Sequence, residues 1–308
     1  MIKVLFVVGP TASGKTDLSI RLAKELNGEI ISADSMQIYK GIHIASAAPD
    51  ESEKCGIPHH LFEFLDLSQE YSVAEYVKAA REKVKEVAAR GKNPIIVGGT
   101  GLYVSSLLDN IEFLDEETDY ELRNSLEEKF DKIGAEQMLK ELAEFDIDSA
   151  NRLHPNNRRR IIRAFEVYIK TGKTFTEQNA LSKNGETEIE PLVFGITFKD
   201  REKLYERINR RVDIMLENGL FEEAKTTFGN NKKGGFQAIG HKELYPVFSG
   251  ESTKEECVEK LKQQTRRYAK RQLTWFRRDS RINWFYPDDD SNYFENALKL
   301  AQIFLKEE

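Results

Sequence analysis

Eight residues near the N-terminus, 9–16, constrain this chain of 308 residues more than any other stretch. They read Gly-Pro-Thr-Ala-Ser-Gly-Lys-Thr and match the phosphate-loop pattern G-x-x-x-x-G-K-[ST] at every fixed position. A β-branched apolar run at 3–8 precedes them, and an amphipathic segment at 17–27 follows with leucines four residues apart. This strand–loop–helix order directs backbone N–H groups, Lys15 and the Thr16 hydroxyl toward a bound phosphate and its Mg²⁺. The pattern predicts that a phosphate is held here, but not whose.

The composition is that of an ordinary soluble globular protein, with 40% hydrophobic and 32% charged residues. No apolar stretch approaches the length of a membrane span, and the short run at 4–8 leads directly into the phosphate loop, which argues against a signal peptide. The two cysteines, Cys55 and Cys257, fit no metal or disulfide pattern. We therefore expect a cytoplasmic protein without membrane contact.

The net charge of −6 does not exclude a nucleic-acid partner, because the charges are unevenly distributed. Residues 260–281 alone carry nine Lys or Arg against one acidic residue. The electrostatic field at a surface depends on where charges lie rather than on their sum.

Three further segments have the composition of buried parallel strands, at 29–33, 93–97 and 192–198. A helix is predicted over 73–90, where Ser72 and Glu75 form a capping box and Gly91 ends the helix. Alternating strands and helices indicate an α/β fold, a P-loop NTPase or kinase-like parallel sheet with flanking helices.

The segment 114–190 is strongly charged and helical in pattern, with no strand signal. We predict that it is an all-helical insertion domain in a core made of 1–113 and 191–308. Long helices are expected in the last third of the chain, at 202–218 and 254–278.

Two motifs follow predicted strands directly. Asp34 comes after 29–33, and Gly98-Gly99-Thr100-Gly101 comes after 93–97. Ligands of parallel sheets bind at the carboxyl ends of the strands, so both motifs should lie beside the phosphate loop. There Asp34 could act as a general base or contact Mg²⁺, and the paired glycines could let a ligand approach the backbone. Alternatively, Asp34 caps the strand end and the glycines form a plain turn. Asp66 is a weaker candidate carboxylate.

Arginines cluster on three segments predicted to be helical. Residues 158–163 carry four, with Asn156 as the expected helix cap. Arg207, Arg210 and Arg211 share a helix with a buried apolar stripe, and 260–281 mixes cations with Tyr268, Trp275 and Phe276. Guanidinium groups grip phosphate oxygens at two points, so these segments suit RNA or a diphosphate. Solvated charged faces are the alternative, and core packing is favoured for Trp275 and Phe276.

Four motifs stand in the order found in tRNA dimethylallyltransferases, and the chain closely resembles the bacterial members of that family over nearly its whole length. They are the phosphate loop, Asp-Ser-Met-Gln-Ile-Tyr at 34–39, Gly-Gly-Thr-Gly-Leu-Tyr at 98–103 and His-Pro-Asn at 154–156. The resemblance implies transfer of a dimethylallyl group from its diphosphate to N6 of the adenine 3′ of the anticodon, position 37 of tRNA, with release of diphosphate. The plant adenylate isopentenyltransferases share the loop, but the arginine segments look more like the tRNA-modifying branch.

The same resemblance implies roles for individual residues. Asp34 would be the catalytic base and Thr100 would contact the adenine. The diphosphate would be bound by Gly9, Pro10, Thr11, Ala12, Ser13, Gly14, Lys15, Thr16 and Arg211, with Mg²⁺ held through Thr16. The anticodon stem-loop of tRNA would contact Asp34, Ser35, Met36, Gln37, Thr100, Arg123, Arg159, Arg160, Ile161, Ile162, Arg163, Gln237, Ala238, Ile239, Gly240, His241 and Lys242. We expect a monomer with no obligate protein partner. A small-molecule kinase of the same fold and a non-catalytic RNA-binding protein remain alternatives.

Overall fold

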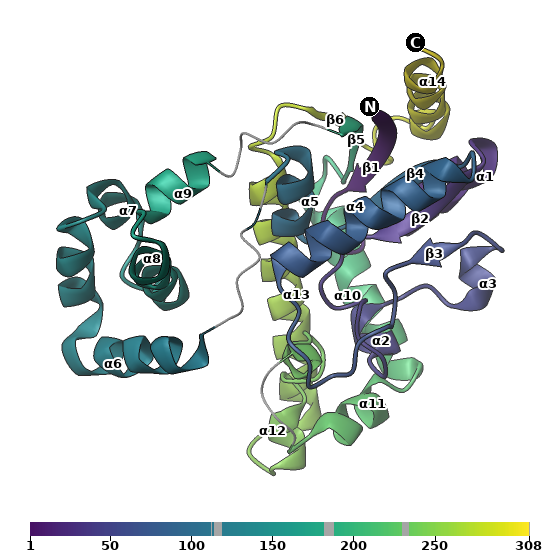
Figure 1. The fold of residues 1–308 in the computed structure, drawn as a ribbon. Coiled ribbons are helices and arrows are strands. Elements are labelled where there is room, and N and C mark those ends of the chain that lie inside the picture. Colours follow the sequence, from purple (N-terminus) through teal and green to yellow (C-terminus); the bar gives the residue numbers. More distant parts are fainter. Residues whose placement is uncertain (112, 114–118, 182–187, 230–233, 308) are drawn as a thin grey trace. The chain divides into compact units, whose positions relative to one another are not determined.

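The structure is a computed structural model that describes residues 1–111, 113, 119–181, 188–229 and 234–307 (Figure 1). The chain divides into two compact units. The core unit comprises Met1–Leu108 with Thr187–Glu308, and the helical unit is Asp109–Glu186. The predicted start of the insertion, residue 114, lies outside the described residues, and its predicted end, residue 190, lies in a strand of the core unit.

The core unit is built on a six-stranded sheet in which every paired strand is parallel, with the order β3-β2-β4-β1-β5-β6. The strands are β1 (Ile2–Val8), β2 (Gly28–Ser32), β3 (His59–His60), β4 (Asn93–Gly98), β5 (Ile189–Ile196) and β6 (Ile282–Phe285). The predicted α/β class and four of these strands are confirmed. The sequence did not predict β3 and β6, because runs of two and four residues are too short to show a periodic pattern.

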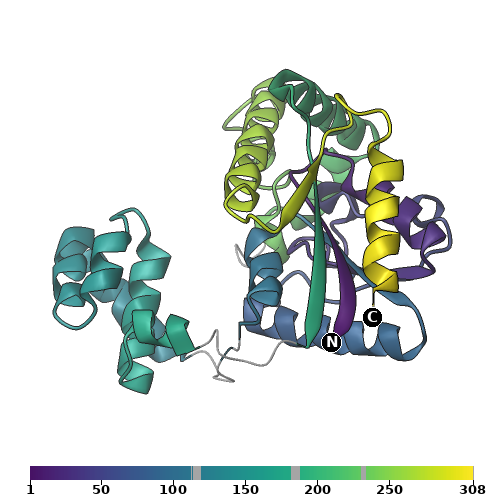
Figure 2. The same cartoon turned by 90° about the horizontal axis from the view of Figure 1, so that it is seen from above.

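Alternation along β1 sends its side chains to both faces of the sheet. Val4, Phe6 and Val8 pack on one face, while Leu5 and Val7 pack on the other. The first face is covered by α4 (Val73–Ala89), α5 (Gly101–Leu108) and α13 (Lys254–Phe276), and the second by α1 (Lys15–Glu25) and α14 (Tyr293–Lys306). Figure 2 shows β1 beside β5, its partner in the sheet, with α14 alongside. Helices on both faces explain why five consecutive residues of β1, Val4 to Val8, are all apolar and buried.

The predicted capping box at the start of α4 is confirmed. The Ser72 hydroxyl accepts a hydrogen bond from the Glu75 N–H, and the Glu75 carboxylate accepts one from the Ser72 N–H. The remaining helices of the core unit are α2 (His43–Ser46), α3 (Glu51–Lys54), α10 (Arg201–Glu217), α11 (Leu220–Thr227), α12 (Tyr245–Phe248) and the 3₁₀ helix η1 (Gly234–Gln237).

The described part of the helical unit consists of α6 (Tyr120–Ala143), α7 (Ile147–Arg152), α8 (Arg158–Thr171) and α9 (Phe175–Leu181). Its core gathers apolar side chains from α6 and α8, among them Leu126, Met138, Ile161 and Phe165. The expectation that Asn156 caps the arginine-rich helix is wrong. The residue at that position is Asn157, and its side chain makes no capping hydrogen bond.

Among the residues described, none of the helices combines the length and the apolar character that crossing a membrane requires.

Candidate functional site

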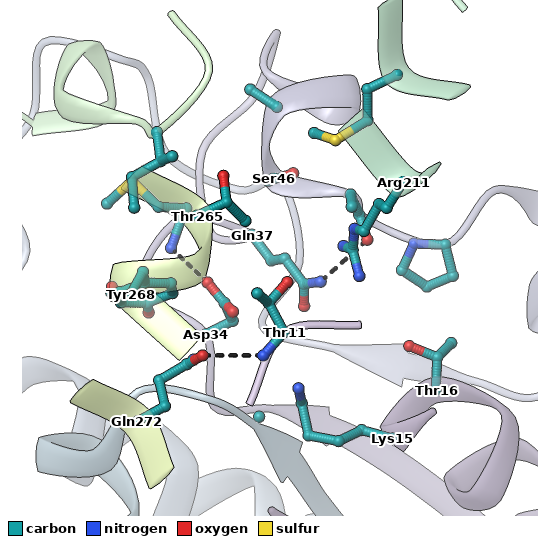
Figure 3. A pocket seen from close by; sticks show the side chains of 18 of the residues that line it. Thr11, Lys15, Thr16, Asp34, Gln37, Ser46, Arg211, Thr265, Tyr268 and Gln272 are labelled. Atoms are coloured by element: carbon teal, nitrogen blue, oxygen red, sulfur yellow. Dashed lines mark hydrogen bonds between the residues drawn. The ribbon is translucent and has the colours of Figure 1, made fainter. Parts of the chain in front are cut away.

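A cavity of about 300 Å³ opens in the core unit where β1, β2 and β4 end (Figure 3). The phosphate loop contributes Thr11, Lys15 and Thr16 to its lining, and the turn after β2 contributes the four residues 34–37. Helices α10 and α13 close it from the other side. The phosphate loop and Asp34 therefore meet at one edge of the sheet, as expected, and line the same cavity.

The phosphate loop connects β1 to α1 with two glycines in conformations that other residues rarely adopt. Gly9 has φ 153°, and a side chain there would overlap the Ile196 carbonyl. Gly14 has φ 100° and is the N-cap of α1, without a capping side chain. The α1 N-terminus is thus built from backbone N–H groups, the arrangement that binds anions. Pro10, Ala12 and Ser13 complete the loop, and the buried Ser13 hydroxyl has no hydrogen-bond partner among the residues that the structure describes.

Two cations face each other in the cavity. Lys15 donates a hydrogen bond of 2.7 Å from Nζ to the Pro10 carbonyl. Burial, and to a smaller extent the charge of Arg211, lower the pKa of Lys15 to about 8, while the charge of Asp34 opposes the shift. Burial also lowers the pKa of Arg211. Paired, poorly hydrated cations favour a multiply charged anion between them, because such a ligand relieves both the desolvation and the repulsion.

The three arginines of α10 have different environments. Arg211 lines the cavity. Arg207 is exposed and donates a 3.0 Å hydrogen bond from Nε to the Ala12 carbonyl, while its guanidinium lies over the Phe198 ring. Arg210 is exposed. The structure therefore brings Arg211 toward a ligand and leaves Arg207 as a brace on the outside of the phosphate loop.

Asp34 is held in place by the end of β4. The Asp34 carboxylate accepts a 2.9 Å hydrogen bond from the Met36 N–H, which closes a tight turn. Thr100 Oγ1 accepts one of 2.9 Å from the Ser35 N–H, and the Thr100 N–H donates one of 3.1 Å to the Ala33 carbonyl. Thr100 is not among the residues lining the cavity, and its hydroxyl is engaged with Ser35. Its position supports the Asp34 turn from behind.

Sequence reasoning missed Gln272. Its buried side chain accepts a 2.9 Å hydrogen bond from the Thr11 N–H and donates one of 2.9 Å to the Gly99 carbonyl. Figure 3 shows it beside Asp34 and Tyr268. Tyr268, one turn earlier on α13, also lines the cavity, and burial raises the pKa of its hydroxyl. The signal in the sequence was the spacing 261, 265, 268, 272 and 276, which marks one face of α13 among the cations.

The glycines after β4 accommodate the protein rather than a ligand. A side chain at Gly99 would overlap the Gln272 amide, one at Gly101 would overlap Trp275, and one at Gly98 would overlap the Ala33 backbone. The idea that they admit a ligand is therefore not supported. Trp275 donates from Nε1 to the Ser105 hydroxyl at 2.8 Å, and Phe276 is buried, so the favoured reading of these aromatics as core residues is confirmed.

The segment 237–242 forms another wall of the cavity. Gln237, Ile239 and Lys242 line it. By contrast, Ala238 and His241 are buried, with exposed fractions of 1% and 0%, so their side chains face the interior, and the RNA contact of this segment stays a prediction. Gly240, with φ 116°, packs near Ala45. Asp66, the weaker candidate, is exposed, faces Lys40 and does not line the cavity.

In the helical unit, the predicted RNA-binding residues fall into two groups. Arg159, Arg160 and Arg163 are exposed. Arg123 and Arg163 both pair with the buried carboxylate of Glu166, at 2.6 Å and 3.2 Å. Ile161 and Ile162 are buried in the core of the unit, and the RNA contact of the stretch that contains them stays a prediction.

Comparison with known proteins reveals a consistent set of relatives. The family model described as IPP transferase matches residues 37–279. The tRNA dimethylallyltransferase of Thermoanaerobacter sp. (strain X514) is 46% identical over 298 residues, covering 96% of this chain and 95% of that protein. The tRNA dimethylallyltransferase of Bacillus subtilis (strain 168) is also 46% identical, over 303 residues, covering 98% of this chain and 95% of that one.

Solved structures show the same similarity. The full-length tRNA isopentenylpyrophosphate transferase from Bacillus halodurans matches with a TM-score of 0.74 at 39% identity, covering 99% of this chain and 97% of that one. A eukaryotic dimethylallyltransferase acting on tRNA matches with a TM-score of 0.76 at 32% identity, covering 90% of this chain and 70% of the other.

Proposed function

This chain belongs to the IPP transferase family, and on that premise we propose that it transfers a dimethylallyl group from dimethylallyl diphosphate to N6 of the adenine beside the anticodon, position 37 of tRNA. The C1–O bond to the diphosphate breaks, a C1–N6 bond forms, the N6 proton passes to a base, and the diphosphate leaves with the bonding electrons. The observation that carries the proposal is the shared cavity, where Lys15 and Arg211 lie with the Asp34 carboxylate.

The cationic side of the cavity suits the leaving group. Negative charge grows on the diphosphate as the C1–O bond breaks, and preorganised donors stabilise it without reorganisation. The N–H groups at the start of α1, Lys15 and the planar guanidinium of Arg211 are such donors.

The Thr16 hydroxyl lines the cavity beside Lys15, an arrangement that fits Mg²⁺, which is usually held by one or two protein oxygens together with substrate phosphates. When bound there, Mg²⁺ would add positive charge next to the diphosphate oxygens.

Asp34 suits the role of base. The exocyclic amine of adenine is a poor nucleophile because its lone pair is delocalised into the ring, so removing its proton as the new bond forms lowers the barrier. The hydrogen bond from the Met36 N–H orients the carboxylate, and Thr100 anchors the turn through Ser35. We assign Thr100 to positioning this turn at least as much as to contacting the adenine.

Each of the two units offers its own candidate contacts to RNA. An adenine must leave its stack to enter an enclosed site, and Ser35, Met36, Gln37, Gln237 and Lys242 line the cavity that would receive it. The exposed Arg159 and Arg160 would contact tRNA phosphates. We also propose that the protein acts on tRNA in the cytoplasm as a monomer, without an obligate protein partner.

The test is a reaction of the purified protein with unmodified tRNA, dimethylallyl diphosphate and Mg²⁺ in the absence of ATP. We expect equimolar diphosphate and N6-dimethylallyladenosine in the digested tRNA, measured by mass spectrometry. A parallel reaction with ATP and no prenyl donor tests the kinase alternative, and one with a free adenylate acceptor tests the adenylate isopentenyltransferase alternative. Phosphate transfer, or prenylation of the adenylate but not of tRNA, would contradict the proposal.

A further inference from the structure

Glu223, on α11, joins two walls of the cavity although it does not line the cavity itself. Its Oε2 accepts a hydrogen bond of 2.8 Å from the Ile44 N–H, and its Oε1 accepts one of 2.9 Å from the Ala45 N–H. The same Oε1 lies 2.8 Å from Nε2 of His241. One carboxylate thus holds the backbone of α2 and the side chain of the segment 237–242.

The bonds to α2 replace a missing helix cap. Helix α2 is a single turn, and its N-cap residue, Ile42, has no side chain able to accept hydrogen bonds from the first N–H groups. Glu223 supplies both acceptor oxygens, although it lies 179 residues after Ile44 and 178 residues after Ala45 in the sequence. Helix α2 contributes Ala45 and Ser46 to the cavity lining, so the position of this wall depends on Glu223.

The bond to His241 fixes the second wall. His241 has an exposed fraction of 0%, and its Nδ1 lies 3.0 Å from the Thr227 hydroxyl, which also accepts a 3.0 Å hydrogen bond from the Tyr245 hydroxyl. A carboxylate only accepts hydrogen bonds, so Nε2 carries the proton that faces Glu223. Ile239 and Lys242, on either side of His241, line the cavity. The buried imidazole therefore anchors the residues exposed to the ligand.

The hydrogen bonds of Glu223 support only the walls of the cavity formed by α2 and the segment 237–242. The phosphate loop is braced by Gln272 and Arg207 instead, and neither residue bonds to Glu223. Loss of the Glu223 bonds should let α2 and the segment 237–242 shift while the phosphate loop stays in place. A residue that only stabilised the fold would affect both sides alike.

We propose that Glu223 is a positioning residue that sets the spacing between α2 and the segment 237–242, and so shapes the part of the cavity that admits the target base. The effect of Glu223 on the kinetics with tRNA rests on the proposed function. The structural part of the proposal, that Glu223 holds the two walls together, can be tested without any turnover.

The first experiment compares Glu223→Gln with Glu222→Gln, its exposed neighbour on α11. A Gln side chain has a single acceptor oxygen for two N–H groups, so one amide of α2 loses its partner. We expect faster hydrogen exchange at Ile44 and Ala45 only in Glu223→Gln. We also expect KM for tRNA to rise about tenfold in this variant, because one buried hydrogen bond to a charged group is lost. KM for dimethylallyl diphosphate should stay within about twofold of the wild-type value.

A second pair of variants tests the His241 contact and remains available should Glu223→Gln not fold. The amide nitrogen of Gln reaches the position of Nε2, whereas that of Asn reaches the position of Nδ1. His241→Gln should therefore keep the bond to Glu223 and a KM for tRNA near that of the wild type. His241→Asn should lose the bond and raise this KM.

Three outcomes would overturn the inference. They are unchanged exchange at Ile44 and Ala45 in Glu223→Gln, equal effects of the two His241 variants, and parallel loss of affinity for both substrates. If the wild-type protein does not modify tRNA, the proposed function fails, but the exchange comparison still decides whether Glu223 holds the two walls.

Discussion

The side chain of Gln272 accepts a 2.9 Å hydrogen bond from the backbone N–H of Thr11, a residue 261 positions earlier in the chain. Through its other end it donates to the Gly99 carbonyl, so one amide joins the phosphate loop to the end of β4. Thr100, next to Gly99, holds the turn that carries Asp34. The phosphate loop and the candidate base therefore share a common support, which α13 provides.

Gln272→Leu should lower kcat about tenfold and the free energy of unfolding by about 1–3 kcal/mol, because both backbone groups lose a buried partner. Steady-state kinetics and urea denaturation measure the two effects. Gln263→Leu, an exposed change on the same helix, is the matched control and should change neither. Equal behaviour of the two variants would show that the bridge has no role in the site.

Alanine at the glycines after β4 should have graded effects. At Gly98 the added methyl would overlap the Ala33 backbone, which cannot move without distorting β2. At Gly99 it would overlap the end of the Gln272 side chain, which can rotate away. We expect Gly98→Ala to cost about 3 kcal/mol of stability or prevent folding, and Gly99→Ala to cost about 1 kcal/mol while impairing activity. Chemical denaturation gives the order, and the reverse order would refute this explanation.

The low pKa of Lys15 should make diphosphate binding depend on pH. Its value in the folded protein is about 8, so above this pH the free protein loses the positive charge that the diphosphate requires. Affinity for dimethylallyl diphosphate should fall by up to about tenfold per pH unit above 8, with proton uptake on binding. Titration calorimetry at pH 7.5 to 9.5 in two buffers measures both quantities. Lys15→Met should bind more weakly and lose this dependence.

The same pKa has a consequence for stability. The ordinary value of 10.5 applies to the unfolded chain, and the folded value of about 8 lies below it. Between pH 8 and pH 10.5 the unfolded chain binds more protons at Lys15 than the folded protein does. The contribution of Lys15 to the free energy of unfolding therefore rises with pH in this range. Comparison of wild type with Lys15→Met in urea across this range isolates that contribution.

Asp34→Asn should reduce the rate of prenyl transfer by about 10² to 10⁴ while leaving dimethylallyl diphosphate binding nearly unchanged. Asparagine keeps an oxygen for the Met36 N–H, so the turn should persist, but it cannot take the N6 proton. Single-turnover kinetics and equilibrium binding separate these effects. Asp17→Asn, an exposed change at the start of α1, serves as control. A small loss of rate would mean that another group acts as base.

Arginines of the helical unit should differ in their contribution to RNA binding. Arg159 and Arg160 are exposed, whereas Arg158 is paired with Asp131. Arg159→Ala and Arg160→Ala should each weaken tRNA binding and reduce the slope of log K against log salt by about one. Arg158→Ala should leave this slope nearly unchanged. Filter binding at several salt concentrations measures it, and equal slopes for the three variants would contradict the assignment.

Much of the site could be predicted because its signals are local. The phosphate loop is a contiguous pattern, and Asp34 follows a recognisable strand. Gln272 and Glu223 could not be assigned in this way, since their partners lie far away in the sequence and their roles exist only after α13 and α11 have packed. The resemblance implies RNA contacts for the stretches that contain Ile161, Ile162, Ala238 and His241. These four side chains are buried, so within each stretch they anchor the residues beside them.

The order of the strands also affects how the protein is made. The first strand synthesised, β1, lies between β4 and β5, and it pairs with β5 along residues 2–8, which reach their partners only after residue 195 has been added. Gln272 follows later still. During synthesis the phosphate loop therefore leaves the ribosome early, whereas α13, which supports the loop, is among the last parts to emerge. A nascent or truncated polypeptide that ends before α13 would contain the phosphate-loop motif but not the site that it forms in the folded protein.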